Sequence, residues 1–343
     1  MADEKVRNME QFAALSGISR PTVSKYFNDP ASVRDSTRQR IEAALAQYEY
    51  RPNIYAVNQN RQLTKNIGIM VPFLADPFFA EIARKIETLC IEAGFRPILL
   101  SAHGAPEQEV ENLENLLSLR PAGVLLAPLG RASDRGAIEK FCAQVPTVLF
   151  DSNVDGVGDA FVGMDNPQSI DIMIKYLTDT GEPPVFFEMQ TPPNPNANKR
   201  RHAYLRAMEQ LGYEPQIIHV PGAGWEFEDI GFREGMRVLS EHRLMTNTIL
   251  CSNDRLAIGL LAAAYESGLR VGRGTGSALR IAGHDDHPFS RFTCPSLTTV
   301  AQDYDSIASK GVETLMSLIE SGSRPANRED WLFAGRLITR NSA

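Results

Sequence analysis

The first 50 residues carry apolar positions at near-helical spacing on both sides of a glycine. These positions are Phe12, Leu15, Ile18, Val23 and Phe27. Gly17 lies between the two halves of the pattern and can adopt the positive φ that a tight turn between helices needs. Ser19 is a good N-cap, and Pro21 falls in the first turn of the next segment, where its missing N–H has no cost. A third helix is predicted from Ser36 to about Tyr48, so this head of the chain is expected to be all-α.

From Asn66 onward, short apolar runs alternate with amphipathic segments. The runs of the first series are Ile67–Val71, Pro97–Leu100, Gly123–Ala127 and Thr147–Phe150, with helices expected at Phe79–Ala93, Glu107–Leu119 and Ala137–Ala143. A second series has runs at Val185–Glu188, Ile217–Val220, Thr248–Cys251 and Leu279–Ala282. Strands interleaved with such helices predict an α/β body of two lobes with doubly wound parallel sheets. Ligands bind beyond the carboxyl ends of such strands, so a cleft is expected between the lobes.

Composition agrees with a globular chain of two or three domains. Of its 343 residues, 43% are hydrophobic and 22% charged. No apolar run approaches about 18 residues, and the N-terminal residues lack the apolar centre of a signal peptide, so we expect a soluble cytoplasmic protein. The cysteines Cys90, Cys142, Cys251 and Cys294 are far apart and form no C-x-x-C, which favours reduced thiols over a zinc site.

Charge is divided unevenly along the chain. Residues 1–65 hold 10 Lys/Arg and 7 Asp/Glu, a net charge of +3. The other 25 basic and 35 acidic side chains give residues 66–343 a net charge of −10. A basic head on an acidic body is typical of a nucleic-acid-binding module joined to a domain that does not contact phosphates. A charge of +3 on 65 residues also arises by chance, so charge alone does not decide the function.

The start of the second predicted helix carries the groups that a DNA-binding helix needs. Two helices joined by a glycine-containing turn are typical of a helix-turn-helix, whose second helix enters the major groove. Hydroxyls there contact phosphates or base edges, and Arg or Lys contacts guanine O6 and N7. The residues that supply these groups are Ser19, Arg20, Thr22, Ser24 and Lys25. A solvated three-helix bundle would show a similar pattern.

Four segments of the head distinguish these alternatives. FAALSGIS, TVSKYFN, VRDSTRQRIEAAL and YRPN occur in the order and spacing of the LacI/GalR (lactose-repressor) family of bacterial transcription regulators, which the chain resembles to about residue 340. The resemblance implies that Ser19, Arg20, Pro21, Thr22, Ser24 and Lys25 open the recognition helix, with Arg20, Pro21 and Lys25 at base-reading positions. Asn28 and Ser36 correspond to residues that contact the DNA backbone and so position the protein on the duplex.

The family's architecture implies how the chain is divided. We expect a DNA-binding domain at residues 1–50, a hinge helix or linker at 51–65, and an effector-binding and dimerisation domain at 66–343 that is similar to periplasmic binding proteins. Within this body we expect an N-lobe at about 66–164 and 299–326, and a C-lobe at about 165–298 and 327–343.

The hinge segment departs from the family's pattern. On DNA the family's hinge helix inserts an apolar wedge into the minor groove, which kinks the duplex. Asn53, Ala56, Val57 and Gln59 correspond to the hinge contacts. Ala56 matches, but Gln59 replaces the usual leucine and Val57 the usual arginine. Either the bend is weaker, Val57 or another residue inserts, or Gln59 forms hydrogen bonds in the minor groove.

Candidate effector-binding residues fall at the ends of predicted strands, where aromatic faces and a few charged groups are typical of small-molecule sites. The candidates are Phe78, Phe79, Asp151, Arg201, Trp225, Asn253, Asp285 and Gln302. Asp285 matches the family's G-Y-D-D segment and is the strongest. Asn253 matches a sugar-contacting position. Arg201 matches a ligand-binding arginine, although its neighbours Lys199 and Arg200 are alternatives as the donor.

Several candidates have an alternative that involves no ligand. One of Phe78 and Phe79 could be a hydrophobic staple at a helix start, Asp151 could be a turn former, and Trp225 could be an ordinary core residue. Asp254, beside Asn253, could be an acidic residue favoured by the helix dipole. His284 and His287 flank Asp285 and Asp286 in a cluster that suggests a metal, but ligand contact or solvation is favoured there.

These residues predict a receptor and not an enzyme. The sequence has no P-loop, no G-x-S-x-G elbow and no His pair at metal-binding spacing, so we expect no cofactor and no metal. The candidate set suits a sugar or polyol, the Lys199-Arg200-Arg201 cluster leaves a sugar acid or phosphate open, and a purine is less favoured. A transporter's solute-binding protein would carry a signal peptide and no basic head, and a sugar-modifying enzyme would turn over its sugar.

The predicted function is that of a ligand-controlled transcriptional regulator, most simply a repressor. A homodimer would bind double-stranded, pseudo-palindromic operator DNA, with half-sites about one helical turn apart. An effector in the cleft would change operator affinity through its different affinities for two states of the protein. The last residues carry no leucine heptads, so we expect a dimer and not a tetramer.

Overall fold

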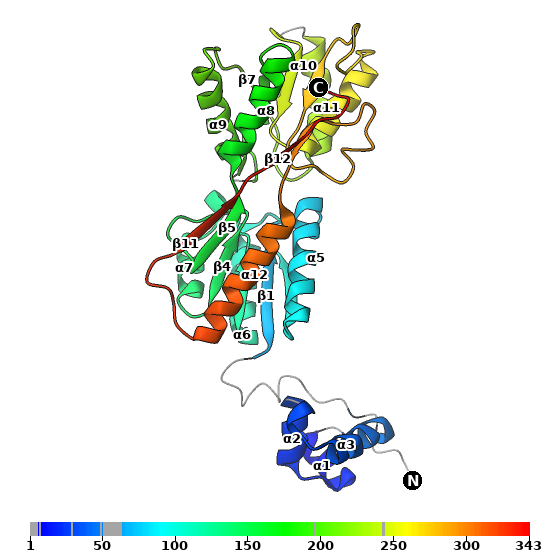
Figure 1. The fold of residues 1–343 in the computed structure, drawn as a ribbon, viewed down its shortest axis with the longest axis vertical. Helices are drawn as coiled ribbons and strands as arrows, with labels where there is room; N and C mark the ends of the chain where they lie inside the picture. The colour runs from blue at the N-terminus through cyan, green and yellow to red at the C-terminus, as the bar shows by residue number, and fades with distance from the viewer. Residues whose placement is uncertain are drawn as a thin grey trace. The chain divides into compact units, whose positions relative to one another are not determined.

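The chain divides into two units, Met1–Thr64 and Lys65–Ala343, which we describe separately. The computed structural model describes residues 6, 8–28, 30–48, 50, 64–194, 196–241 and 244–343, drawn in colour in Figure 1.

In the described part of the head, three α-helices and a short 3-10 turn surround a small apolar core. Its elements are α1 (Met9–Ser16), α2 (Arg20–Asn28), η1 (Pro30–Ser32) and α3 (Asp35–Tyr48). Asn8 caps α1 by accepting a hydrogen bond from the Gln11 amide at 2.9 Å, and Gly17 ends the helix with a φ of 64°. Phe12, fully buried, stacks on Tyr50 with ring centroids 4.8 Å apart.

The N-lobe of the body is a six-stranded parallel sheet in the order β11-β5-β4-β3-β1-β2. Its strands are β1 (Asn66–Val71), β2 (Arg96–Ser101), β3 (Gly123–Leu126), β4 (Thr147–Phe150), β5 (Ala160–Met164) and β11 (Glu329–Phe333). Helices α5 (Pro77–Glu92) and α12 (Tyr304–Ser321) pack together on one face, and α6 (Pro106–Leu119) packs against α7 (Arg135–Cys142). A 3-10 turn, η2 (Gly130–Ala132), follows β3.

The C-lobe is a four-stranded parallel sheet in the order β7-β6-β8-β9. Its strands are β6 (Val185–Met189), β7 (Ile217–Val220), β8 (Thr248–Cys251) and β9 (Arg280–Ala282). Its helices pack in pairs, α8 (Asn166–Thr180) with α9 (Asn196–Gln210) and α10 (Phe227–Ser240) with α11 (Asp254–Glu266). Antiparallel strands β10 (Thr299–Ala301) and β12 (Arg336–Ile338) lie where the chain passes between the lobes, as Figure 1 shows for β12.

Two expectations about the body need correction. Residues 327–343 were assigned to the C-lobe, but β11 pairs in parallel with β5 and is an edge strand of the N-lobe sheet. Strand β5 itself had not been predicted. Its sequence, AFVGM, contains a glycine and follows the glycine-rich loop 154–159, which obscures the strand pattern.

No helix in the described ranges is long and apolar enough to span a bilayer.

Candidate functional site

The head presents the start of α2 as a polar, exposed helix terminus. Ser19 Oγ lies 2.7 Å from Thr22 Oγ1 and accepts a hydrogen bond from the Thr22 amide at 3.4 Å, as an N-cap does. Val23 is fully buried and anchors the helix to the core. Arg20 and Lys25 are exposed and form no ion pair with any described residue. Arg20 at the first position of α2 and Lys25 in its last turn, on a helix held by a cap and an apolar anchor, are suited to nucleic-acid contact.

The remaining predicted head residues are distributed around this terminus. Ser19 and Pro21 are exposed, while Thr22 and Ser24 are half-buried. Ser36, in the first turn of α3, is exposed. Asn28 is the last residue of α2, and its side chain lies outside the described part of the structure. The hinge residues Asn53, Ala56, Val57 and Gln59 also lie outside the described residues.

In the body, a cavity lies between the two lobes at the carboxyl ends of their strands. One wall is aromatic and is formed by Phe78 and Phe79 at the start of α5, Trp225 and Phe227 around the start of α10, and Tyr304. Trp225 packs edge-on against Phe79, with centroids 5.9 Å apart, and stacks on Phe73 at 5.1 Å. Rigid aromatic faces of this kind cover the apolar surface of a ring or chain.

The cavity lining also holds an ion pair. Arg200 Nη2 donates to Asp285 Oδ1 across 2.7 Å, and Gln302 Nε2 donates to the same oxygen at 2.8 Å. Burial by itself would raise the pKa of Asp285, but the charge of Arg200 and the hydrogen bond from His284 outweigh it and lower the pKa to about 2. Asp285 is therefore a fixed, ionised acceptor in the cavity wall.

His284 supports this carboxylate from within the protein. Its Nδ1 lies 3.0 Å from Asp285 Oδ1, and its Nε2 lies 2.8 Å from Ser169 Oγ. Burial and the nearby Arg200 lower the pKa of His284 to about 4, so the ring is neutral at neutral pH. A neutral ring that donates from Nδ1 to Asp285 accepts from the Ser169 hydroxyl at Nε2.

A second ion pair joins the two lobes at the cavity. Asp76 of the N-lobe accepts from Arg255 Nη1 of the C-lobe at 3.0 Å. Asp76 also caps α5, because its Oδ1 accepts from the Phe78 amide at 2.9 Å. Arg255 also donates to both carboxylate oxygens of Glu228, at 2.6 and 2.7 Å. Both cavity arginines, Arg200 and Arg255, are thus already matched by carboxylates.

The structure brings six of the eight predicted effector-binding residues into the cavity lining. These six are Phe78, Phe79, Trp225, Asn253, Asp285 and Gln302. Asn253 has a second role, since its Oδ1 caps α11 by accepting from the Leu256 amide at 2.8 Å. Trp225 is only 5% exposed and therefore belongs to the core, and it also lines the cavity.

Two predicted residues are not in the lining. Arg201 turns away and bonds Glu188 Oε1 at 3.2 Å and Asn198 Oδ1 at 2.8 Å, while its neighbour Arg200 lines the cavity. Consecutive residues of a helix point about 100° apart, so only one of the two arginines can face the cavity. Asp151 is buried behind the cavity, where its carbonyl and Oδ1 accept from Asn196 Nδ2 at 3.1 and 2.9 Å. It therefore joins the lobes and does not line the cavity.

The cavity also contains residues that the sequence had not indicated as ligand contacts. They include Asp76, Asn194, Arg255 and Tyr304. Arg200, the alternative to Arg201, and His287, from the cluster around Asp285, also line the cavity. Asp76 precedes Pro77 and Phe78 in a helix-start pattern that could have located it at the same strand end. Across the described ranges, His, Cys, Asp and Glu side chains form no group of three or more that could hold a metal.

The two units match known families separately. Residues 8–53 match the family described as bacterial regulatory proteins, lacI family, and residues 175–343 match the periplasmic binding protein-like domain. The ribose operon repressor of Escherichia coli (strain K12) is 29% identical over 314 residues, which cover 91% of this chain and 92% of that protein. The chain belongs to the lacI family of bacterial regulatory proteins.

Other similarities extend over almost all of this lacI-family chain. The HTH-type transcriptional repressor PurR of Haemophilus influenzae (strain PittEE) is 28% identical over 344 residues, covering 97% of this chain and 98% of that protein. A crystal structure of the lac repressor dimer bound to operator and the anti-inducer ONPF has the same fold, with a TM-score of 0.81, 24% identity and coverage of 98% and 99%. The predicted family and fold class are confirmed, and the lacI-family chain is a transcriptional regulator and not an enzyme.

Proposed function

We propose that the chain is a cytoplasmic repressor that binds a pseudo-palindromic operator as a homodimer through the start of α2. The exposed cations Arg20 and Lys25, with no ion-pair partner among the described residues, support this role. Residues 1–50 would bind DNA, 51–65 would form the hinge, and 66–343 would bind the effector and dimerise, with residues 329–333 belonging to the N-lobe. Asn28, Ser36 and the hinge residues Asn53, Ala56, Val57 and Gln59 are assigned to DNA contact on the family resemblance.

The effector would be a neutral, polyhydroxylated molecule. One observation carries this assignment: Arg200 and Arg255 are both paired with carboxylates in the cavity. An anionic sugar acid or phosphate would need a cation that these pairs already neutralise, and would be repelled by Asp285 and Asp76. A sugar instead places its hydroxyls on charged acceptors such as Asp285 and its apolar ring face on aromatic side chains.

D-ribose is the first sugar to test, because a ribose operon repressor is 29% identical over 91% of this chain. A purine is the second candidate, since PurR is similar over a comparable length and the aromatic wall could stack on a base. Ligand binding would favour one relative arrangement of the lobes, and operator affinity would change by the difference in ligand affinity between the two states.

The proposal can be tested on the purified full chain with two measurements. Melting temperature is followed with D-ribose, D-xylose, D-gluconate and hypoxanthine, and operator binding is followed by gel shift on DNA from upstream of its own coding sequence. A neutral sugar should raise the melting temperature and change operator affinity, and Asp285→Asn should remove the response to that sugar. A response to gluconate or hypoxanthine alone would refute the neutral-sugar assignment, and absence of any DNA binding would refute the repressor assignment.

A further inference from the structure

Two polar atoms of the cavity-lining residues are buried without a hydrogen-bond partner. They are His287 Nε2 and Gln302 Oε1, on side chains only 6% and 7% exposed, and neither has a partner in the described part of the chain. Buried donors and acceptors in native proteins are almost always matched, because leaving them unmatched is costly. Two such atoms on residues that line one cavity are therefore candidates for contact with its ligand.

Whether His287 Nε2 is a donor or an acceptor follows from the hydrogen bond at the other ring nitrogen, Nδ1. The Phe289 backbone N–H donates to His287 Nδ1 at 3.1 Å, so Nδ1 carries a lone pair and no proton. Burial lowers the pKa of His287, and Arg255 adds to the effect while Glu228 and Asp285 oppose it, so the ring is neutral at neutral pH. In a neutral ring the proton is then on Nε2, which is a hydrogen-bond donor.

The unmatched Gln302 atom is assigned as an oxygen from the hydrogen bond at the other end of the amide. Gln302 Nε2 donates to the ionised Asp285 at 2.8 Å, which fixes the orientation of the amide. The other end of the amide, Oε1, is therefore a carbonyl acceptor. The lining thus offers one unmatched donor and one unmatched acceptor, both uncharged.

Asp254 holds the two segments that carry these residues. Its Oδ2 accepts from the His287 backbone N–H at 2.8 Å, and its Oδ1 accepts from Thr299 Oγ1, in β10, at 2.6 Å. Gln302 follows directly after β10. Asp254 is fully buried and lies at the start of α11, so both segments are positioned by one rigid element.

We propose that His287 Nε2–H, beside the already predicted effector contact Gln302, is a specificity contact that selects a hydroxyl group on the effector. This inference rests on the proposed neutral-sugar function. A hydroxyl is the uncharged group that both donates and accepts, so a polyol satisfies both atoms, whereas an analogue that lacks the contacting hydroxyl leaves one of them unmatched. His287 is a ligand contact here, and Asp254 is the residue that positions it.

The test is a cycle between protein and ligand, measured by calorimetric titration. D-ribose, 2-deoxy-D-ribose and 5-deoxy-D-ribose are titrated into the wild-type chain and into His287→Phe, which keeps an aromatic ring but removes the donor. His287→Gln places an amide N–H near the position of Nε2 and serves as the conservative variant. His202→Phe, an exposed histidine of α9 outside the cavity, is the matched control.

We expect His287→Phe to weaken D-ribose binding about tenfold, His287→Gln to restore part of the loss, and His202→Phe to bind as the wild type does. The wild type should bind at least one deoxy analogue about tenfold more weakly than ribose, and His287→Phe should lose that discrimination. Equal ribose affinity of the wild type and His287→Phe, or full discrimination retained in the variant, would overturn the inference. A wild-type chain that binds neither these sugars nor any other neutral sugar of the melting screen would overturn the proposed ligand class, and the inference with it.

Discussion

Arg200 Nη2 lies 2.7 Å from Asp285 Oδ1 in the cavity wall, and both side chains are held in place by the C-lobe. The other guanidinium nitrogens of Arg200 donate to Asn166 Oδ1 at 2.9 Å and to the Ser252 carbonyl at 2.8 Å. One buried cation thus joins the start of α8, the end of β8 and the loop after β9. The same bonds that fix the ligand-facing carboxylate also stabilise the lobe.

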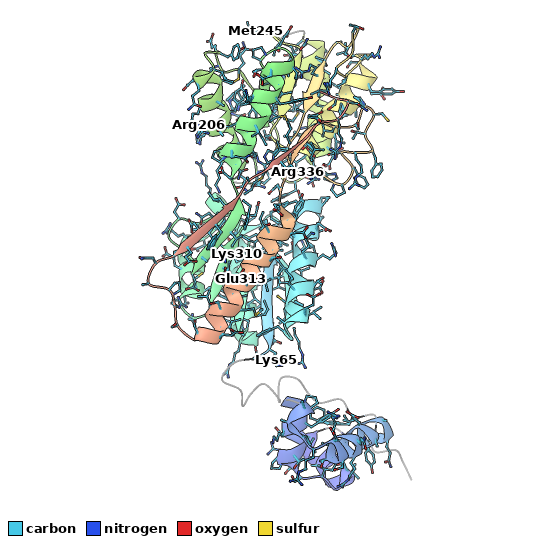
Figure 2. All side chains as sticks on the ribbon, viewed as in Figure 1. Lys65, Arg206, Met245, Lys310, Glu313 and Arg336 are labelled. Atoms are coloured by element: carbon cyan, nitrogen blue, oxygen red, sulfur yellow. The ribbon has the colours of Figure 1, made fainter. Side chains whose placement is uncertain are left out.

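Replacing Arg200 should therefore destabilise the body strongly. Arg200→Met leaves Asp285 as a buried charge without its cation, which is expected to lower the free energy of unfolding by about 3 kcal/mol. Arg206→Met is the matched control, since Arg206 projects from the same helix at the surface (Figure 2) and pairs with exposed Asp171. The control should change stability by at most about 0.5 kcal/mol. Urea unfolding of the two variants measures the contrast, and equal losses would contradict the argument.

Asp151 should make the stability of the body depend on pH. Burial raises the pKa of Asp151 to about 7, although Arg200 and Lys199 oppose the shift. A carboxyl with a raised pKa in the folded state contributes its full stability below the unfolded pKa, near 3.9, and loses it as the pH rises to about 7. Asp151→Asn cannot ionise, so its unfolding free energy should exceed that of the wild type increasingly across this range, by about 4 kcal/mol in all.

The amide also suits the local hydrogen bonds. Asp151 Oδ2 and Asn196 Oδ1 are both buried acceptors without a partner among the described residues. An amide or a protonated carboxyl at position 151 supplies a donor there, and the ionised carboxyl does not. Urea unfolding at pH 5 and pH 8 tests the prediction, with the exposed Asp155→Asn as control. A gap between variant and wild type that stays constant with pH would show that Asp151 does not titrate in this range.

Removing the exposed cations of α2 should weaken DNA binding by the head and leave ligand binding in the cavity unchanged. Arg20→Ala with Lys25→Ala removes the two exposed cations of α2, and each contact to a base edge is expected to contribute about 1–3 kcal/mol. We expect operator affinity to fall at least about tenfold in a gel shift, with the ligand-induced rise in melting temperature unchanged. Lys175→Ala with Arg206→Ala removes two exposed cations of the body and controls for net charge. Unchanged operator binding by the head variant would exclude α2 as the recognition helix.

Local patterns predicted much of this fold because its caps, turns and buried strands are encoded locally. Gly17 and Ser19 mark the helix boundaries of the head, and β4, β7 and β8 begin and end where their apolar runs do. Strand β11 was assigned to the wrong lobe because its sequence, EDWLF, begins with two acidic residues and is mostly exposed at a sheet edge, so it lacks the pattern of a buried strand. Its pairing with β5, more than 160 residues earlier, depends on the path of the chain and not on its own pattern.

The candidate site, like the fold, could be predicted from the sequence only in part. Asp285 and Gln302 could be located from the family resemblance, and both line the cavity. The choice between Arg200 and Arg201 depends on the rotation of α9 about its axis, which is set by packing against α8. The Asp76–Arg255 pair joins residues 179 positions apart on different lobes, so no local pattern indicates it.

That ion pair between the lobes should set how strongly the ligand binds. Asp76→Asn removes the charge that attracts Arg255 but retains an N-cap for α5, because asparagine caps a helix as well as aspartate does. If the ligand favours the closed arrangement, a smaller closed population raises its apparent Kd by the same factor. We expect a rise of about three- to tenfold in calorimetric titration with the sugar identified by the melting screen. Because ligand and operator binding are linked, the sugar concentration that gives half of the change in operator binding should rise by the same factor.

Glu81→Gln is the control for this prediction. It breaks the Glu81–Arg84 pair on the same helix without touching the other lobe, and should leave both values unchanged. A Kd equal to that of the wild type in Asp76→Asn would mean that this bridge does not control closure.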